Sequence, residues 1–151
     1  MPLTYRRATR ADLAFMVGLI AEDFVGPTPD DAADAEALEY AAALDAIAAD
    51  PRNELYIAEL DGRPVGTLQL TYLPGIMRRG MWRGLIESVH IIPSERNKGL
   101  GGEMLRWAAG RCREMGCGMV QLTSNKARVD AHRFYRKLGY EQSHEGFKLY
   151  L

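Results

Sequence analysis

Long apolar runs are absent from this sequence, and so is any leader-like beginning. No stretch of the 151 residues approaches the roughly 18 apolar residues that a membrane-spanning helix needs. The first residues carry Arg6, Arg7 and Arg10, but no apolar segment and no small-residue cleavage site follow them, as a secretory signal would require. We therefore expect a soluble protein that makes no membrane contact, with the cytoplasm as its location.

Cysteine is scarce, and this scarcity excludes two kinds of protein. The only cysteines are Cys112 and Cys117, which lie near an expected helix end without the His or Cys partners that a zinc site needs. A disulfide-stabilised secreted domain and a structural zinc domain are both disfavoured. We expect two free thiols and no bound metal.

The net charge of the sequence is also small, but its two halves carry net charges of opposite sign. Residues 1–75 contain 5 Lys and Arg against 13 Asp and Glu, whereas residues 76–151 contain 14 against 7. A basic C-terminal half suits an anionic partner. Nucleic acid is disfavoured because no helix-turn-helix, zinc-finger or RNP pattern is present to read bases. A phosphorylated small molecule is the better prediction.

The hydrophobic pattern predicts a single domain spanning residues 1–151, with alternating strands and helices. Asp61-Gly62 joins two strand-like runs and predicts an antiparallel hairpin, whereas residues 74–83 have the composition of a flexible loop that borders a substrate pocket. The expected strands are 3–7, 55–60, 64–72, 84–92 and 119–123, followed by two C-terminal strands.

Helix starts are marked by capping residues. Thr9 and Asp12 have the spacing of a capping box, and Thr28 followed by Pro29 is typical of a second start. The expected helices are one after Thr9, then 31–49, 99–115 and 130–138. Together these elements indicate a mixed sheet with helices on both faces.

The most informative segment, residues 87–102, combines a strand, a turn at Pro93, three glycines and the start of a helix. A helix N-terminus presents free backbone N–H groups, and glycine lets a diphosphate approach the backbone closely. Arg96 and Lys98 add positive charge. The segment predicts a phosphate-binding loop.

The spacing of this loop separates three known phosphate-binding patterns. A P-loop needs Gly-Lys-Ser/Thr, but here Lys98 precedes Gly99 and no hydroxyl follows. The dinucleotide fingerprint needs a third glycine at the position of Met104. The remaining pattern, Arg96-x-x-Gly99-x-Gly101, resembles the pyrophosphate-binding signature of the GNAT superfamily of acyl-CoA-dependent N-acyltransferases.

Two further motifs in the same order strengthen this resemblance. Val89, Ile91 and Pro93 match the family's strand end before the loop, and residues 131–140 match its C-terminal Ala-x-x-Phe-Tyr-x-x-x-Gly-Phe/Tyr pattern. The resemblance implies an α/β (α+β) GNAT fold, with a mixed, mostly antiparallel sheet of about seven strands and about four helices on both faces. It also implies acetyl-CoA as acyl donor and direct attack by an amine, with no acyl group held on the enzyme.

The resemblance assigns residues to the donor. The N–H of Val89 would polarise the thioester carbonyl, Ile91 would pair with the pantetheine amides, and the loop would hold the pyrophosphate. The residues expected to contact coenzyme A are Val89, Ile91, Arg96, Asn97, Lys98, Gly99, Leu100, Gly101, Gly102 and Asn125.

Tyr135 matches the family tyrosine that donates a proton to the departing thiolate, although a tyrosine in this helix is also compatible with plain core packing. Glu87 is the expected base, because strand alternation places it on the face shared by Val89 and Ile91. Alternatively, Glu87 is only a solvated carboxylate, and a water chain acts as the base. His90 is expected on the opposite face as a structural histidine.

The acceptor is less constrained by the sequence. Residues 121–144 resemble aminoalkylphosphonate N-acetyltransferases, which act on small amines that bear an anionic group. The cations expected to bind such a group are Arg78, Arg79, Arg83 and Arg128. The acidic N-terminal half instead favours a polyamine or aminoglycoside. A protein substrate, a non-catalytic acyl-CoA sensor and a homodimer formed through residues 147–151 are further hypotheses.

Overall fold

The computed structural model describes residues 2–23 and 30–151, so the expected helix start at Thr28 and Pro29 lies outside the described residues. The chain divides into two units, residues 1–121 and residues 122–151. Each unit is described by itself.

A five-stranded sheet in the order β1-β2-β3-β4-β5 forms the centre of the first unit. The pairs β1–β2, β2–β3 and β3–β4 are antiparallel, whereas β4 and β5 run parallel. The strands are β1 (Thr4–Arg7), β2 (Asn53–Leu60), β3 (Arg63–Leu73), β4 (Trp82–Ile91) and β5 (Cys117–Gln121). The tight β2–β3 connection at Asp61-Gly62 confirms the predicted hairpin.

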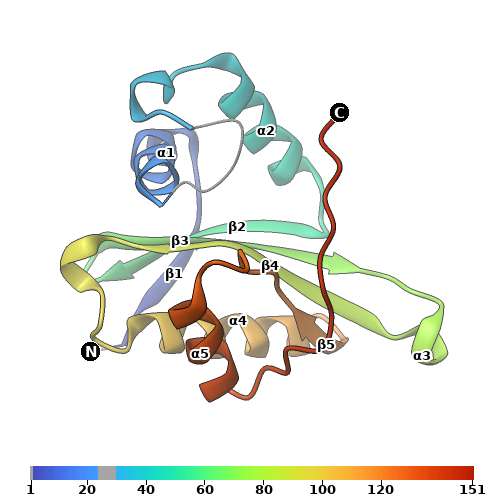
Figure 1. The fold of residues 1–151 in the computed structure, drawn as a ribbon. Helices are drawn as coiled ribbons and strands as arrows, with labels where there is room; N and C mark the ends of the chain where they lie inside the picture. The colour runs from blue at the N-terminus through green and yellow to red at the C-terminus, as the bar shows by residue number, and fades with distance from the viewer. Residues whose placement is uncertain (1, 24–29) are drawn as a thin grey trace. The chain divides into compact units, whose positions relative to one another are not determined.

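Helices cover both faces of this sheet. In Figure 1, α1 (Leu13–Glu22) and α2 (Leu38–Ala49) lie over one face, and α4 (Leu100–Glu114) lies over the other. Apolar side chains on both faces are buried, among them Val17 of α1, Leu68 of β3 and Met104 of α4. Burial of this apolar surface is the main stabilising contribution to the three-layer arrangement.

Four short stretches depart from the predicted elements. The helix expected over 31–49 is a 3-10 turn (Ala32–Asp34) followed by α2, because the Asp31 side chain accepts a hydrogen bond from Ala33 N–H and favours a turn. The predicted loop 74–83 contains the short helical turn α3 (Met77–Gly80), where Arg78 and Arg79 have φ of 56° and 61°. Two further 3-10 turns, Arg10–Asp12 and Pro93–Glu95, precede α1 and α4.

The second unit contains one helix, α5 (Val129–Lys137), and residues 138–151 form no helix or strand. The two expected C-terminal strands are therefore absent, and the sheet has five strands rather than seven. Phe147, Leu149 and Leu151 alternate with polar residues as a strand requires. However, a β-strand forms its backbone hydrogen bonds with a neighbouring strand. No strand lies within residues 122–151 to act as that neighbour.

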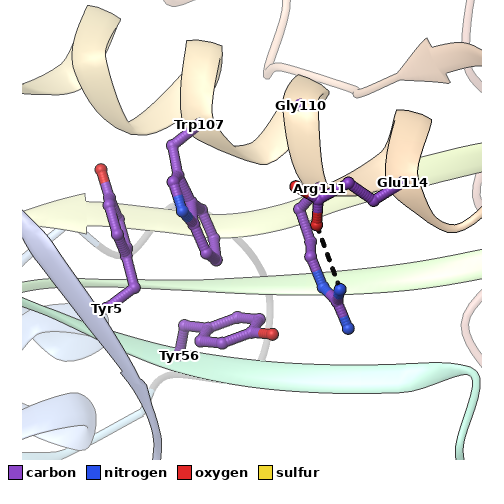
Figure 2. A pocket seen from close by; sticks show the side chains of 6 residues that line it. All are labelled: Tyr5, Tyr56, Trp107, Gly110, Arg111 and Glu114. Carbon is purple, nitrogen blue, oxygen red and sulfur yellow. Dashed lines mark hydrogen bonds and ion pairs between the residues drawn. The ribbon is translucent and has the colours of Figure 1, made fainter.

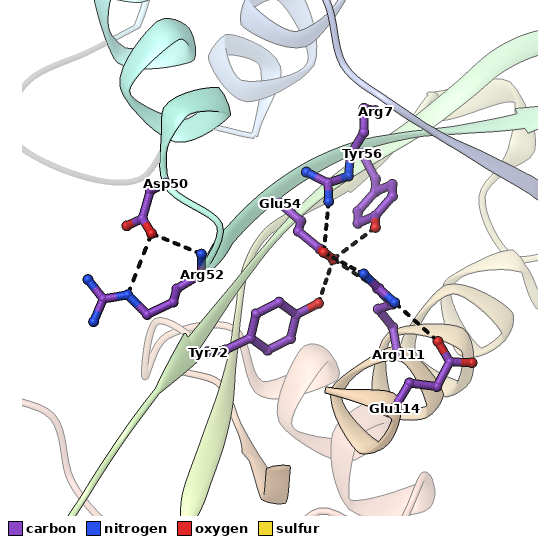
Figure 3. A network of polar contacts seen from close by, with 8 residues as sticks. All are labelled: Arg7, Asp50, Arg52, Glu54, Tyr56, Tyr72, Arg111 and Glu114. Carbon is purple, nitrogen blue, oxygen red and sulfur yellow. Dashed lines mark hydrogen bonds and ion pairs between the residues drawn. The ribbon is translucent and has the colours of Figure 1, made fainter. Parts of the chain in front are cut away.

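The buried carboxylate of Glu54 on β2 joins three strands to α4 (Figure 3). Arg111 of α4 donates to both carboxylate oxygens, at 2.6 and 3.0 Å, and Arg7 of β1 donates at 2.8 Å. The hydroxyls of Tyr56 and Tyr72 donate at 2.8 and 2.5 Å. The Glu54 side chain is only 2% exposed, so these five hydrogen bonds replace its hydration.

This network changes the acidity of Glu54. Burial raises the pKa of the carboxyl, but the hydrogen bonds from Arg111, Tyr72 and Tyr56 outweigh burial and lower the pKa to about 2. A carboxyl whose folded-state pKa is depressed stabilises the fold above its unfolded-state pKa. That contribution is lost as pH falls through the folded-state value.

Replacement of Glu54 should therefore be costly. Glu54→Gln leaves Arg7 and Arg111 facing a neutral group, and we expect unfolding to become easier by about 3–5 kcal/mol at neutral pH. Urea denaturation measures this loss. The difference from wild type should shrink as pH falls from 5 to 2, where wild-type Glu54 becomes protonated.

Glu114→Gln is the matched control. Glu114 also contacts Arg111, at 3.3 Å, but its side chain is 70% exposed. We expect its loss to change the free energy of unfolding by about 1 kcal/mol or less. Equal effects of the two substitutions would contradict a special role for Glu54.

Close packing of β4 against α4 restricts Gly84. A Cβ atom built on Gly84 would lie 2.3 Å from Sγ of Cys112, whose thiol is fully buried. Burial raises the pKa of Cys112 to about 11, so this thiol stays protonated at neutral pH. Cys112 acts here as a small apolar group that fixes the distance between helix and sheet.

We expect Gly84→Ala to destabilise the fold by about 1–3 kcal/mol through overpacking. Adding Cys112→Ala to this variant should recover part of the loss, because it removes the sulfur. Gly110→Ala on α4 is the control, since a Cβ there meets nothing within 4 Å and alanine favours a helix interior. Thermal unfolding of the four proteins checks the order, and destabilisation by Gly110→Ala would contradict it.

Candidate active site

An irregularity in β4 sets the geometry of the site. Thr67 of β3 pairs with His90, and Gln69 pairs with Glu87. Two steps along β3 thus correspond to three along β4, which is a β-bulge. Ser88 takes up the extra residue with φ of 50°.

The bulge reverses the expected alternation of side chains. Directly paired residues of antiparallel strands share a face, so Glu87 and His90 lie on the face of Gln69 and Thr67. Ile91 pairs with Gly66, which faces Met104 of α4, so Ile91 lies on the opposite face. The prediction that Glu87 shares a face with Val89 and Ile91 was wrong, because uninterrupted alternation was assumed.

The β5-facing edge of β4 loses its partner half-way along. Parallel pairing between β4 and β5 ends at Leu85 and Gln121. Within the described part of the first unit, no strand pairs with this edge of β4 from there to Ile91. Ile92 N–H donates to Val65 C=O on β3, so the backbone of Ile91 faces the unpaired edge. This edge offers backbone groups to an extended ligand.

The glycine loop follows that edge and ends at the N-terminus of α4. Gly99 is the N-cap of this helix with φ of 82°, and Asn97 has φ of 62°. The first amides of α4 have no partner within the helix and carry its positive dipole end. Lys98 Nζ donates to Glu95 at 3.1 Å, so its charge is partly compensated. The arrangement fits the expected diphosphate.

Arg96 is held inside the fold, a role that differs from direct phosphate contact. Its Nε donates to Ile91 C=O at 3.0 Å, and its terminal nitrogen contacts both carboxylate oxygens of Asp23, at 3.2 and 3.3 Å. Asp23 is the C-cap of α1. The sequence reading missed Asp23, because its partners are 67 and 73 residues away and no local pattern marks it.

A small pocket of about 130 Å3 lies between the two N-terminal helices and the sheet. Apolar side chains of α1 and α2 form most of its wall, and the sheet contributes Leu55, Thr67, Gln69 and Ser88. It therefore reaches the bulge on the face that also bears Glu87 and His90. Its lining is mostly apolar, with the polar side chains of Tyr40, Thr67, Gln69 and Ser88 among it.

A larger hollow of about 410 Å3 lies on the α4 side of the sheet (Figure 2). Tyr5 and Trp107 stack there with ring centres 3.8 Å apart, and Tyr56 meets Trp107 edge-on. Arg111 and Glu114 complete the wall. Arg111 is already paired with Glu54, and neither the bulge nor the glycine loop contributes to this hollow.

Three of the four arginines expected to bind an anionic acceptor lie near the start of β4. Arg78 and Arg79 are exposed on α3, and Arg83 is half-buried, with its Nε lacking a partner among the described residues. Arg83 precedes Ile91 by eight residues, a span of about 26 Å along a strand. The arginines are therefore well separated from the glycine loop, whereas Glu87 is about 13 Å from Arg83.

The expected acid, Tyr135, belongs to the second unit and is half-buried on α5. Burial raises the pKa of Tyr135, while Arg128 lowers it by a smaller amount. A raised pKa keeps the phenol protonated at neutral pH, as proton donation requires. Asn125 caps the turn before α5, where its side chain accepts from Ala127 N–H at 2.9 Å. Arg128 is exposed.

Comparison with known proteins agrees with this geometry. The acetyltransferase (GNAT) family matches residues 14–140. The chain belongs to this family. It is 34% identical, over 113 residues and 73% of each chain, to an aminoalkylphosphonate N-acetyltransferase of Salmonella typhimurium. As a GNAT protein it is an N-acetyltransferase, and its acyl donor is acetyl-CoA.

Solved structures resemble the chain over its whole length. A protein of Bacillus halodurans described as a transcriptional regulator is 38% identical, with a TM-score of 0.92 over 99% of both chains. An acetyltransferase of Clostridium acetobutylicum with acetyl-CoA has a TM-score of 0.72 at 19% identity, over 98% of this chain and 96% of that one. The second likeness concerns the fold alone.

Two kinds of feature are absent from the described residues. No cluster of three or more His, Cys, Asp or Glu side chains there is arranged to hold a metal ion. None of the helices in residues 2–23 and 30–151 is long and apolar enough to cross a membrane.

Proposed function

We propose that this GNAT enzyme transfers acetyl from acetyl-CoA to the primary amine of a small molecule that also bears an anionic group, such as an aminoalkylphosphonate. The observation that carries the proposal is the unpaired edge of β4, which leads directly into the glycine-capped N-terminus of α4. An extended amide-containing chain ending in a diphosphate fits this combination.

On the donor side, the backbone does most of the binding. The N–H of Val89 polarises the thioester carbonyl, and Ile91 pairs with the pantetheine through its N–H, because its carbonyl already accepts from Arg96. The diphosphate is held by amides of residues 97–102: Asn97, Lys98, Gly99, Leu100, Gly101 and Gly102. Arg96 shapes the loop, and Asn125 completes the donor site.

The reaction is a direct transfer. The unprotonated amine attacks the thioester carbon, so that an N–C bond forms and the C–S bond breaks. Tyr135 gives its phenolic proton to the departing thiolate, and a base on β4 takes the proton of the amine. Glu87 is the predicted base. The bulge brings His90 to the same face, so two candidates are available.

The acceptor's anionic group is proposed to meet Arg83, with Arg78, Arg79 and Arg128 as further cations. The half-buried Arg83 supports this choice, since its Nε has no partner among the described residues and it has no ion pair there. The curated relative's aminoalkylphosphonate activity points to the same class. We further propose a cytoplasmic enzyme that dimerises through residues 147–151.

A thiol-release assay with acetyl-CoA tests the function. The acceptors are aminoalkylphosphonates, amino acids, polyamines, aminoglycosides and a lysine peptide, each with and without divalent metal. We expect the aminoalkylphosphonates to give the fastest thiol release. Arg83→Gln should raise KM for an anionic acceptor, and Arg133→Gln, an exposed cation of α5, should not. Release with polyamines or aminoglycosides alone would overturn the anionic class. Acetyl-CoA binding without any release would favour the sensor.

The role of Tyr135 is tested by Tyr135→Phe. We expect acetyl-CoA binding to persist in calorimetry while kcat falls by about 10²-fold or more, a size typical of lost general acid catalysis. Tyr150→Phe, an exposed tyrosine of the same unit, is the control. Unchanged turnover of Tyr135→Phe would assign this tyrosine to core packing.

A further inference from the structure

Three elements meet at the carboxylate of Asp23. His90 Nδ1 on β4 lies 3.0 Å from Asp23 Oδ2, and Arg96 of the glycine loop contacts both oxygens of the same carboxylate. The side chain of His90 is 14% exposed, and that of Asp23 is 25% exposed. The end of α1, the strand after the bulge and the phosphate loop are thus joined by one acidic group.

The bulge places His90 on the face of β4 that borders the small apolar pocket. His90 pairs with Thr67, and Thr67 lines the pocket between the N-terminal helices and the sheet together with Ser88. Without the extra residue at Ser88, position 90 would fall on the opposite face from Glu87. The backbone therefore brings an oriented imidazole to the face that also bears Glu87.

Hydrogen-bond chemistry fixes the state of the imidazole. An ionised carboxylate only accepts hydrogen bonds, so Nδ1 of His90 must be the donor to Asp23. In the neutral ring Nε2 then carries the lone pair, and Nε2 has no partner among the described residues. Arg96 places a permanent positive charge beside the Asp23 carboxylate.

We propose that His90 is the base that removes the proton from the acceptor's ammonium group, and that Asp23 is its positioning residue. The N–H bond of the ammonium breaks, its electron pair stays on nitrogen for attack, and the proton forms an Nε2–H bond. The imidazolium is stabilised by Asp23 and later loses the proton to solvent. This inference rests on the proposed amine acetylation and identifies its base.

Glu87 is the competing candidate, and its surroundings differ. It is exposed and makes no hydrogen bond or ion pair within the described part of the chain, whereas His90 is held by Asp23. The charged groups facing His90 there are Asp23 from α1, Arg96 from the loop and Glu87 from its own strand, while β3 contributes the uncharged Thr67. An oriented, partly buried base is the better placed of the two.

The pH dependence of kcat/KM, measured with the most active amine of the panel, tests the pair. His90→Gln should lower kcat/KM by about 10²-fold or more at neutral pH, with recovery at alkaline pH, where the free amine needs no base. Asp23→Asn should lower it by a smaller factor with the same recovery. Glu114→Gln, an exposed carboxylate of α4 outside the proposed site, should leave the pH profile unchanged. A profile altered only by Glu87→Gln would overturn the proposal.

Two measurements separate a base from a structural clamp. Free imidazole should restore activity to His90→Ala without changing its melting temperature, whereas a clamp would not be restored. Nitrogen NMR of the wild-type imidazole should show the Nδ1–H tautomer, and a majority Nε2–H tautomer would overturn the proposal even without an acceptor. If the wild type turns over an amine and His90→Gln is equally active, the assignment of His90 as base is refuted and the proposed function stands. If the wild type acetylates no amine of the panel, the proposed function itself is refuted.

Discussion

One extra residue in β4 is the constraint on which the site depends. The bulge at Ser88 shifts the pairing with β3 by one position, so that Glu87 and His90 share a face while Ile91 looks towards α4. The same strand outruns β5 and leaves its backbone unpaired. The unpaired backbone edge and the side chains of Glu87 and His90 therefore come from a single short segment.

The rest of the first unit holds that segment in place. Glu54 links β1, β2, β3 and α4 through two arginines and two tyrosines, and Gly84 allows α4 to approach β4 closely. These contacts lie on the α4 side of the sheet. The opposite face carries the small pocket and the Asp23 contact, which tie α1 to β4 and to the glycine loop. Rigid packing on one face thus supports an accessible site on the other.

Much of the fold was predictable because its signals are local. Asp61-Gly62 specified a hairpin, the Thr9–Asp12 spacing specified a helix start, and the glycines before α4 specified the anion-binding turn. The failures have a common cause. The two C-terminal strands were inferred from the sequence pattern and from the family resemblance, and neither supplies the partner strand that such a segment needs. Glu54 was missed because one acidic residue within an apolar strand does not reveal its arginine partners.

The sequence by itself determined the family and the donor, because the motif residues Arg96, Gly99 and Gly101 lie close together along the chain. Only the tertiary structure decided which side chains meet beside the bulge of β4. Asp23, His90 and Arg96 are separated by up to 73 residues, and their contact depends on how α1 packs on the sheet. The face of Glu87 depends on a shift between paired strands, which is a property of two segments together and is written in neither one alone.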